Sequence, residues 1–268
     1  MDKVVILAGG MGTRMRECNA EASLDPGQEA VAATGVKALM PIDRPFLDYV
    51  LGDLADAGYT RVCLVIGPKH DAVRHYFGEE LVCERLRIDF AEQASPQGTA
   101  DALAAAETWV GDEPFLMLNS DNYYPRSALA ALRDIGGPGV AVFSWNSMLA
   151  KGNVPEERLS AFAVIESGPD GRLSRIVEKP NKEELKTFNG EWGLGMNCWR
   201  FDARIFAACR AIERSARGEF ELPDAVAWAR GKGVSFRALH IDEAVLDLSS
   251  RADVASIAAL LVGRSVSL

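Results

Sequence analysis

The segment 4–16, VVILAGGMGTRMR, constrains the fold of this chain more than any other stretch. Its apolar start is rich in β-branched residues and is followed by Ala8 and two glycines, a pattern typical of a buried parallel strand that ends in a loop. The loop glycines allow the backbone to turn sharply and bring N–H groups close to an anion, and Arg14 can donate to phosphate oxygens. The segment therefore predicts a phosphate-binding loop directly after the first strand.

Two common phosphate-binding motifs do not fit this loop. A P-loop requires Lys-Ser or Lys-Thr after its last glycine, whereas Thr13 and Arg14 follow Gly12. A dinucleotide-binding fingerprint requires glycine or alanine where Met15 stands. Taken alone, the loop is also compatible with a tight turn that binds no ligand.

The charge of the chain limits the classes of ligand. A formal net charge of -9 at pH 7 argues against a general nucleic-acid-binding protein, because such proteins need a basic surface. Anionic small molecules remain, since a few cations focused in one cleft are enough to bind them.

The cysteines and the hydropathy pattern bear on the compartment. The five cysteines form no CxxC pair and accompany no histidine cluster, which argues against a zinc site and favours reduced thiols. The chain shows no signal-like segment and no apolar run of membrane-spanning length. We therefore expect a cytoplasmic protein without a membrane partner. The cysteines are Cys18, Cys63, Cys83, Cys198 and Cys209.

Short apolar runs alternate with stretches of helical composition in the first half of the chain. This alternation is typical of an α/β protein with a mostly parallel sheet covered by helices on both faces. The second half is richer in strands, and we expect one domain over 1–268 with a nucleotide-binding half, 1–150, and a second half, 151–268. Strands are expected at 4–7, 62–66, 86–90, 115–118, 140–143, 162–166, 173–178, 192–201 and 234–239, and helices at 45–57, 71–77, 100–110, 127–134 and after residue 250.

Two of these strands lead into candidate ligand-binding residues. The strand at 115–118 is followed by Asp121, and a carboxylate at the end of a buried strand costs desolvation unless it is paired or bound to a cation. Asp121 is therefore either a magnesium ligand or the N-cap of the next segment. Gln93, after the strand at 86–90, either reads the edge of uracil or thymine with its amide or bonds to backbone at the strand end.

The connection between Arg14 and Lys37 comprises 22 residues, many of them small and with little periodicity. We expect an irregular, mobile segment over 15–36. It is either a surface loop or a lid that closes over a triphosphate.

Six short motifs occur along nearly the whole chain, and together they resemble the sugar nucleotidyltransferases, which join a sugar 1-phosphate to a nucleoside monophosphate. The spacing QxSPxG is most similar to glucose-1-phosphate thymidylyltransferases, while the neighbouring GTADA also resembles adenylyl-transferring relatives. The resemblance implies a Rossmann-like fold of the nucleotide-diphospho-sugar transferase type with a β-rich sugar-binding half. The motifs are LAGGMGTRM at 7–15, KALMP at 37–41, QASPQGTA at 93–100, DNY at 121–123, EKP at 178–180 and LDL at 246–248.

By the same resemblance, three cations and two carboxylates carry the reaction. Arg14 binds the leaving pyrophosphate, Lys37 the triphosphate and Lys179 the sugar phosphate, whereas Asp121 and Asp247 hold Mg²⁺. The implied nucleotide-binding residues are Leu7, Ala8, Gly9, Gly10, Gly12, Thr13, Gln93, Gly98 and Thr99, and the implied sugar-binding residues are Asn122, Ala163, Glu178 and Asn197.

The chain departs from the family pattern at several positions. Ser120 and Ala163 stand where glycine is usual, Val245 replaces an aromatic residue, and the connection over 15–36 is longer than usual. Three functions therefore stay open. The first is a magnesium-dependent transferase for a hexose 1-phosphate and dTTP or UTP; the second is a phosphocholine-type cytidylyltransferase; the third is a catalytically weak homologue that binds a nucleotide sugar and regulates a partner. A homo-oligomer also stays open.

Overall fold

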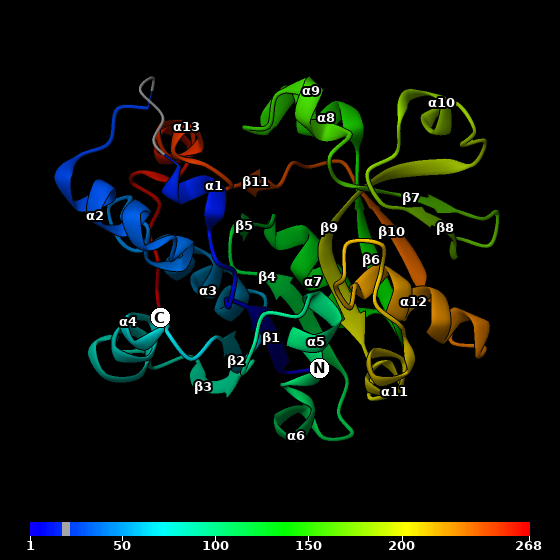
Figure 1. The fold of residues 1–268 in the computed structure, drawn as a ribbon, viewed down its shortest axis with the longest axis horizontal. Helices are drawn as coiled ribbons and strands as arrows, with labels where there is room; N and C mark the ends of the chain where they lie inside the picture. Colours follow the sequence, from blue (N-terminus) through cyan, green and yellow to red (C-terminus); the bar gives the residue numbers. More distant parts are fainter. Residues whose placement is uncertain (18–21) are drawn as a thin grey trace.

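The predicted strands form a mixed β-sheet with helices on both faces (Figure 1), so the expected α/β architecture is confirmed. The computed structural model describes residues 1–17 and 22–268. In these residues the central strand order is β10-β6-β9-β4-β1-β2-β3. Six of these seven strands pair in parallel with at least one neighbour, whereas β9 runs antiparallel to both of its neighbours, β4 and β6. The strands are β1 (Lys3–Leu7), β2 (Arg61–Ile66), β3 (Arg87–Glu92), β4 (Phe115–Asn119), β6 (Gly139–Phe143), β9 (Glu191–Phe201) and β10 (Arg237–Ile241).

Each face of the sheet carries its own hydrophobic core, because alternate residues of a strand point to opposite faces. Val4 and Ile6 of β1 belong to one cluster of buried residues, and Val5 belongs to the other. The first face is covered by α3 (Phe46–Asp56), α7 (Arg126–Asp134) and α13 (Arg251–Leu261). The second face is covered by α5 (Thr99–Ala104), α11 (Arg204–Ala211) and α12 (Leu222–Gly231).

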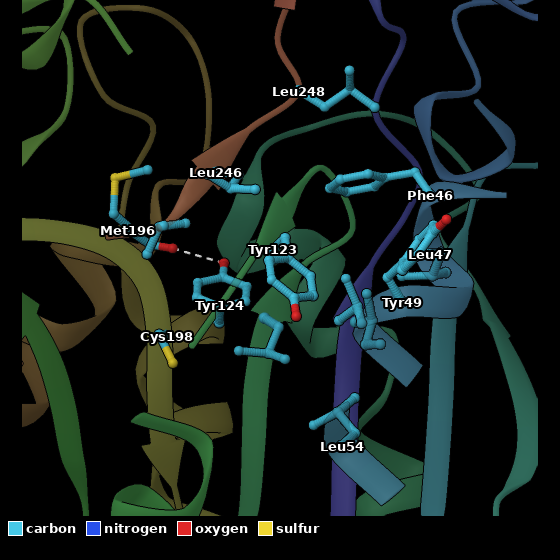
Figure 2. Packing of buried hydrophobic residues seen from close by; sticks show 14 of the residues in the cluster. Phe46, Leu47, Tyr49, Leu54, Tyr123, Tyr124, Met196, Cys198, Leu246 and Leu248 are labelled. Atoms are coloured by element: carbon cyan, nitrogen blue, oxygen red, sulfur yellow. Dashed lines mark hydrogen bonds between the residues drawn. The ribbon is translucent and has the colours of Figure 1, made fainter. Parts of the chain in front are cut away.

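A buried tyrosine joins the middle of the first core to the sheet. Figure 2 shows Tyr124 with its hydroxyl directed at the backbone of Met196, to whose carbonyl it donates over 2.7 Å. Burial raises the pKa of this hydroxyl well above its ordinary value, so it remains a donor. Tyr124 follows the short strand β5 (Asn122–Tyr123), and the bond therefore ties β5 to β9.

The second half of the chain completes the sheet and covers its carboxyl edge. The hairpin predicted at 162–178 is present as β7 (Ala163–Ser167) and β8 (Leu173–Val177), and β7 pairs with β9. Residues near the end of the chain return to the first half, where β11 (Leu246–Asp247) pairs antiparallel with β5. The short helices α8 (Trp145–Lys151), α9 (Glu156–Leu159) and α10 (Lys182–Leu185) lie at the same end of the molecule in Figure 1.

The expectation of an irregular segment over 15–36 is wrong for about half of that connection. Residues 13–16 form α1 (Thr13–Arg16), and residues 26–34 form α2 (Pro26–Thr34). The helix α2 begins with a capping box, in which the Asp25 carboxylate accepts from the Gln28 N–H and the Gln28 side chain accepts from the Asp25 N–H. Pro at the first position and a run of alanines favour the same helix. The prediction of a mobile stretch also covered residues 18–21, which lie outside the described residues together with the thiol of Cys18.

Three smaller boundaries also differ from the expected ones. The helix expected at 100–110 is divided into α5 and α6 (Glu107–Val110), because alanine-rich stretches of this kind do not specify where one helix ends and the next begins. The helix expected at 71–77 is α4 (Asp71–His75), followed by a π-helical turn over Tyr76–Glu80. The last strand begins at Arg237 rather than at residue 234, since its register is set by pairing with β6.

Two further observations concern the thiols and the helices of the described residues. Cys63, Cys83, Cys198 and Cys209 are free cysteines. Within residues 1–17 and 22–268, no helix has the length and apolar character needed to cross a bilayer.

A buried carboxyl in the first turn of α3 provides a test of the packing. The side chain of Asp48 is almost fully buried; one of its oxygens accepts from the Tyr76 hydroxyl at 2.9 Å, and the other has no partner among the described residues. Burial raises the pKa of Asp48 from 3.8 to about 6. The folded protein therefore binds this proton more tightly than the unfolded chain, so the contribution to stability is complete below pH 4 and is lost as the pH rises through 6.

We expect Asp48→Asn to stabilise the protein at pH 8, because an amide needs no proton to remain neutral. A pKa difference of this size corresponds to a gain on the order of 3 kcal/mol at pH 8 that disappears toward pH 4. Urea unfolding from pH 4.5 to 8 measures the difference in free energy of unfolding. Asp112→Asn, at an exposed carboxyl, is the control and should leave the free energy of unfolding unchanged at both pH 4.5 and pH 8. A pH-independent effect of Asp48→Asn would contradict the assignment.

Candidate functional site

Two pockets lie at the edge where β1 and β4 end. The first has a volume of about 420 Å³ and is formed by the glycine loop after β1, by the segment after β3, by the end of β4 and by residues 35–38. The structure thus brings together every residue expected to bind the nucleotide, and Lys37 and Asp121 with them. The expected residues that line this first pocket are Leu7, Ala8, Gly9, Gly10, Gly12, Thr13, Lys37, Gln93, Gly98, Thr99 and Asp121.

The second pocket is smaller, about 200 Å³, and adjoins the first. Asn119 and Asp121 line both pockets, so a ligand in each would meet at these two side chains. All four residues expected to bind the sugar line the second pocket, together with three of the expected catalytic residues. These seven residues are Asn122, Ala163, Glu178 and Asn197, and Arg14, Asp121 and Asp247.

Lys179 is the expected site residue that lines neither pocket. Its side chain is exposed, and its backbone has a φ of +47°. Asn197, which lines the second pocket, has a φ of +52°. Left-handed backbone is uncommon for residues other than glycine and concentrates at functional sites, where surrounding structure holds it. In the described residues these are the two non-glycine positions with positive φ, and both belong to the expected sugar-binding segments.

The position of Gly98 joins the first pocket to α12. Its φ of +119° is accessible to glycine, and a Cβ here would lie 2.3 Å from the carbonyl oxygen of Phe220. Around this contact the Phe220 N–H donates to the Gln97 carbonyl at 2.8 Å, and the Ala100 N–H donates to the Phe220 carbonyl at 2.9 Å. The Thr99 hydroxyl also accepts from the Leu222 N–H at 2.9 Å. The segment 97–100 is therefore held against the start of α12 by backbone contacts.

Gln93 is orientated by two acceptors. Its side-chain N–H groups donate to the Asp101 carboxylate at 2.7 Å and to the Gly98 carbonyl at 3.2 Å. Because both partners are acceptors, the amide nitrogen must face them and the amide oxygen must face the loop at Gly9. The position of a Cβ on Gly9 would be 3.5 Å from that oxygen. Gln93 thus offers a hydrogen-bond acceptor to the pocket while its donors are used within the protein.

The two expected metal ligands each have a cationic partner. Lys37 Nζ lies 2.9 Å from Asp121 Oδ2, and both side chains are partly exposed to the first pocket. Arg158 Nη2 lies 3.0 Å from Asp247 Oδ2, and its other terminal nitrogen lies 2.8 Å from Asp253 Oδ1. Each carboxylate is therefore held in place by a charge that a ligand or metal ion could replace.

Asp247 is nearly fully buried and accepts further hydrogen bonds. Asn122 Nδ2 donates to Oδ1 at 3.0 Å, and the Ser249 hydroxyl donates to Oδ2 at 2.5 Å. Burial, followed by the negative charge of Asp121, raises the pKa of Asp247 to about 6. Asp121 and Asp247 are close because β5 pairs with β11, which places Asn122 opposite Asp247. The surroundings of Asp247 therefore favour a nearby positive charge.

Glu178 is the expected sugar-binding carboxylate. Desolvation by the pocket wall raises its pKa, Glu221 and Asp224 raise it further, and Arg217 and Lys179 oppose them. It lines the second pocket together with Asp121 and Asp247, so this pocket contains three carboxylates.

Several residues around Asp247 were not foreseen from the sequence. Asn153 donates from its side chain to the Asp247 carbonyl at 2.9 Å and accepts from the Asp247 N–H at 2.8 Å. Arg158 contacts the carboxylate itself. Both lie roughly ninety positions before Asp247, in a polar segment without a recognisable motif. For these residues the sequence offers one signal, the Ser-x-x-Asp pattern at 250–253. It marks the capping box of α13, whose Asp253 is the second carboxylate that Arg158 contacts.

Within the described residues, no cluster of three or more His, Cys, Asp or Glu side chains has the arrangement of a metal site. Instead, the glycine loop and Lys37 line the first pocket, and the carboxylates of Asp121 and Asp247 line the adjoining second pocket. Such a site suits a phosphate-bearing ligand, which brings its own oxygen atoms to any bound cation.

Comparison with known proteins agrees with this geometry. The chain is 29% identical to a glucose-1-phosphate thymidylyltransferase of Streptomyces antibioticus over 95% of its own length and 65% of that relative, so it spans somewhat less than two thirds of that protein. It is 24% identical to the UTP–glucose-1-phosphate uridylyltransferase AglF of Haloferax volcanii, over 92% of this chain and 90% of the relative. A solved UDP-glucose pyrophosphorylase in complex with UDP-glucose shares the fold, with a TM-score of 0.74, 19% identity, and coverage of 97% and 98%.

A family model described as nucleotidyl transferase matches residues 3–239, which include both pockets except for the residues from β11 onward. The fold and the match over most of the chain agree, and the chain belongs to the nucleotidyl transferase family.

Proposed function

We propose that this protein transfers a nucleotidyl group from a nucleoside triphosphate to a sugar 1-phosphate, releasing pyrophosphate. The observation that carries the proposal is the meeting of two pockets at Asp121, one lined by the glycine loop and the other by polar residues of the second half. The nucleoside triphosphate binds in the first pocket, and the sugar 1-phosphate binds in the second. The names of the relatives, a thymidylyltransferase and a uridylyltransferase for glucose 1-phosphate, favour a hexose 1-phosphate.

The base is a thymine or uracil in this proposal. The side-chain oxygen of Gln93 faces the first pocket, and the N3–H of these two bases is a donor that an amide oxygen can accept. A cytosine or adenine offers an acceptor at the corresponding ring nitrogen, which would meet the Gln93 oxygen unfavourably. dTTP and UTP are therefore the favoured substrates.

The reaction requires positioning and charge neutralisation. An oxygen of the sugar phosphate attacks the α-phosphorus, a new P–O bond forms, and the bond to pyrophosphate breaks on the opposite side. No side-chain nucleophile and no proton transfer are needed. Lys37 exchanges its contact with Asp121 for the triphosphate, Arg14 neutralises the leaving pyrophosphate, and Lys179 turns from solvent toward the acceptor phosphate.

The two carboxylates fit a magnesium ion. Mg²⁺ prefers oxygen ligands and is usually held by one or two carboxylates and the phosphates of the substrate, which matches the pair Asp121 and Asp247. Burial and then the negative charge of Asp121 raise the pKa of Asp247, and a bound cation held by these two carboxylates would offset that charge. When bound, the ion would withdraw charge from the α-phosphate. Asn122 and Arg158 would keep Asp247 orientated toward it.

The proposed setting is the cytoplasm, where nucleoside triphosphates are available. The free thiols of Cys63, Cys83, Cys198 and Cys209 are those expected of a reducing compartment.

Pyrophosphate release tests the proposal directly. The purified protein is assayed with Mg²⁺ and each common nucleoside triphosphate, crossed with a panel of hexose, N-acetylhexosamine and heptose 1-phosphates and with phosphocholine. We expect release that requires both substrates and is fastest with dTTP or UTP and a hexose 1-phosphate. Release with CTP and phosphocholine alone would contradict the proposal, and so would nucleotide-sugar binding without turnover.

Asp121→Asn should remove most of the turnover and leave the fold intact. The amide is isosteric but lacks the charge needed at the boundary of the two pockets, and we expect kcat to fall by roughly 100-fold or more. Circular dichroism and thermal unfolding check that the protein is folded. Asp170→Asn, at an exposed turn between β7 and β8, is the matched control. A variant with the rate of the wild type in Mg²⁺ would exclude Asp121 from the metal site.

Gly98→Ala should weaken nucleotide binding more than a Gly→Ala change at another position with positive φ, because its Cβ also meets a neighbouring backbone. The added Cβ would lie 2.3 Å from the Phe220 carbonyl and would push 97–100 away from α12. Gly218→Ala is a matched control, because Gly218 has a φ of +78° but open space around it. We expect calorimetry with dTTP to show at least tenfold weaker binding for Gly98→Ala and little change for Gly218→Ala. Equal effects would show that backbone strain alone is responsible.

A further inference from the structure

The helix α2 occupies a connection whose function the proposed reaction does not explain. It lies between α1 and Lys37, and Figure 1 shows α1, α2 and α13 gathered at one end of the molecule. Contacts between α1 and α2 are also direct. Both ends of α2 are fixed, the first by the capping box at Asp25 and the second by Gly35, whose φ is +78°. The helix is thus a defined element beside the first pocket.

The end of α2 packs against the backbone of the glycine loop. A Cβ on Gly12 would lie 2.1 Å from the Gly35 carbonyl oxygen, and a Cβ on Gly35 would lie 2.6 Å from the Met11 carbonyl oxygen. Both glycines have positive φ, and both line the first pocket. The conformation of the loop over 11–12 therefore depends on where α2 ends.

Two arginines hold this arrangement. Arg16, at the end of α1, donates from Nε to the Thr34 carbonyl at 3.0 Å. Arg251, the first residue of α13, donates from Nε to the Met15 carbonyl at 3.0 Å and pairs through Nη1 with Glu29 of α2 at 2.5 Å. The Arg251 side chain is 7% exposed, so its guanidinium has little access to water and bonds to these groups instead. One buried guanidinium thus joins α1, α2 and α13.

We infer that α2 is a brace for the phosphate-binding loop and that Arg251 is a positioning residue of the first pocket. Arg251 does not line either pocket, and it acts through the Met15 carbonyl and Glu29. The brace holds the loop N–H groups in place before a triphosphate arrives, which lowers the ordering cost of binding. The inference rests on the proposed function in that the ligand is taken to be a nucleoside triphosphate.

Arg251→Met tests the role of the arginine. We expect at least tenfold weaker dTTP binding by calorimetry, a similar increase in the KM for dTTP, and less than twofold change in the KM for the sugar 1-phosphate. Amide hydrogen exchange of residues 9–16 should become faster in the protein without ligand. Arg251→Lys and Glu29→Gln each remove part of the contact between residue 251 and α2. Their dTTP binding and their exchange over 9–16 should lie between those of the wild type and Arg251→Met.

Arg85→Met is the matched control. Arg85 also joins a backbone carbonyl, that of Ser267 at 3.0 Å, to a carboxylate, that of Asp56 at 2.7 Å, but it lies away from both pockets. It should lower thermal stability without changing dTTP binding or exchange over 9–16. Equal effects of Arg85→Met and Arg251→Met on dTTP binding would overturn the inference. Unchanged dTTP binding and unchanged exchange over 9–16 in both Arg251→Lys and Glu29→Gln would also overturn the inference. These two variants decide the question if Arg251→Met does not fold.

Gly35→Ala tests the end of α2 by itself. Gly233→Ala is its control, because Gly233 also follows a helix with a φ of +86° but has no atom within contact distance of an added Cβ. We expect faster exchange over 9–16 in Gly35→Ala only, and the same exchange in both variants would contradict the brace. If the wild-type protein binds no nucleoside triphosphate, the proposed function fails, whereas the exchange measurements on the free protein still decide the inference.

Discussion

The parallel pairing of β1 with β4 is the constraint on which the site depends. Their register places Leu7 opposite Asn119, so the glycine loop and the segment with Asp121 leave the sheet at neighbouring points of one edge. Parallel strands place their carboxyl ends together, and ligands of open α/β sheets bind beyond those ends. Pairing of β2 with β1 and with β3 brings Gln93 to the same edge. The first pocket is a consequence of this register.

The second pocket depends on chain segments that return from a distance. The strand β9 enters between β4 and β6 in the antiparallel direction, and it carries Asn197 to the edge where Asp121 lies. The strand β11 pairs with β5 and places Asp247 beside Asn122. Negative charge accumulates there as a result, and Lys37 and Arg158 balance it in the free protein.

The first turn of α13 connects both sides of the site. Asp253 binds Arg158, which contacts Asp247 on the side of the second pocket. Two residues earlier, Arg251 binds the carbonyl of Met15 behind the glycine loop. Buried ion pairs of this kind add little net stability compared with apolar packing, but removing one partner leaves an unpaired charge. Here the ion pairs fix the positions of two segments, the one at Met15 and the one at Asp247.

The sequence by itself determined the elements that rest on local patterns. The β-branched run before Gly9 specifies a buried strand and its loop, and the six motifs specify the family and the residues of the first pocket. Tertiary structure decided the rest. The helix α2 carries its own start signals, the Asp25 capping box and Pro26, but its packing against the glycine loop and the contacts of Arg158 and Arg251 with their carboxylates arise only from long-range packing. Contacts between residues about ninety or more positions apart leave no periodicity in the chain, because they depend on how the strands are ordered in the sheet.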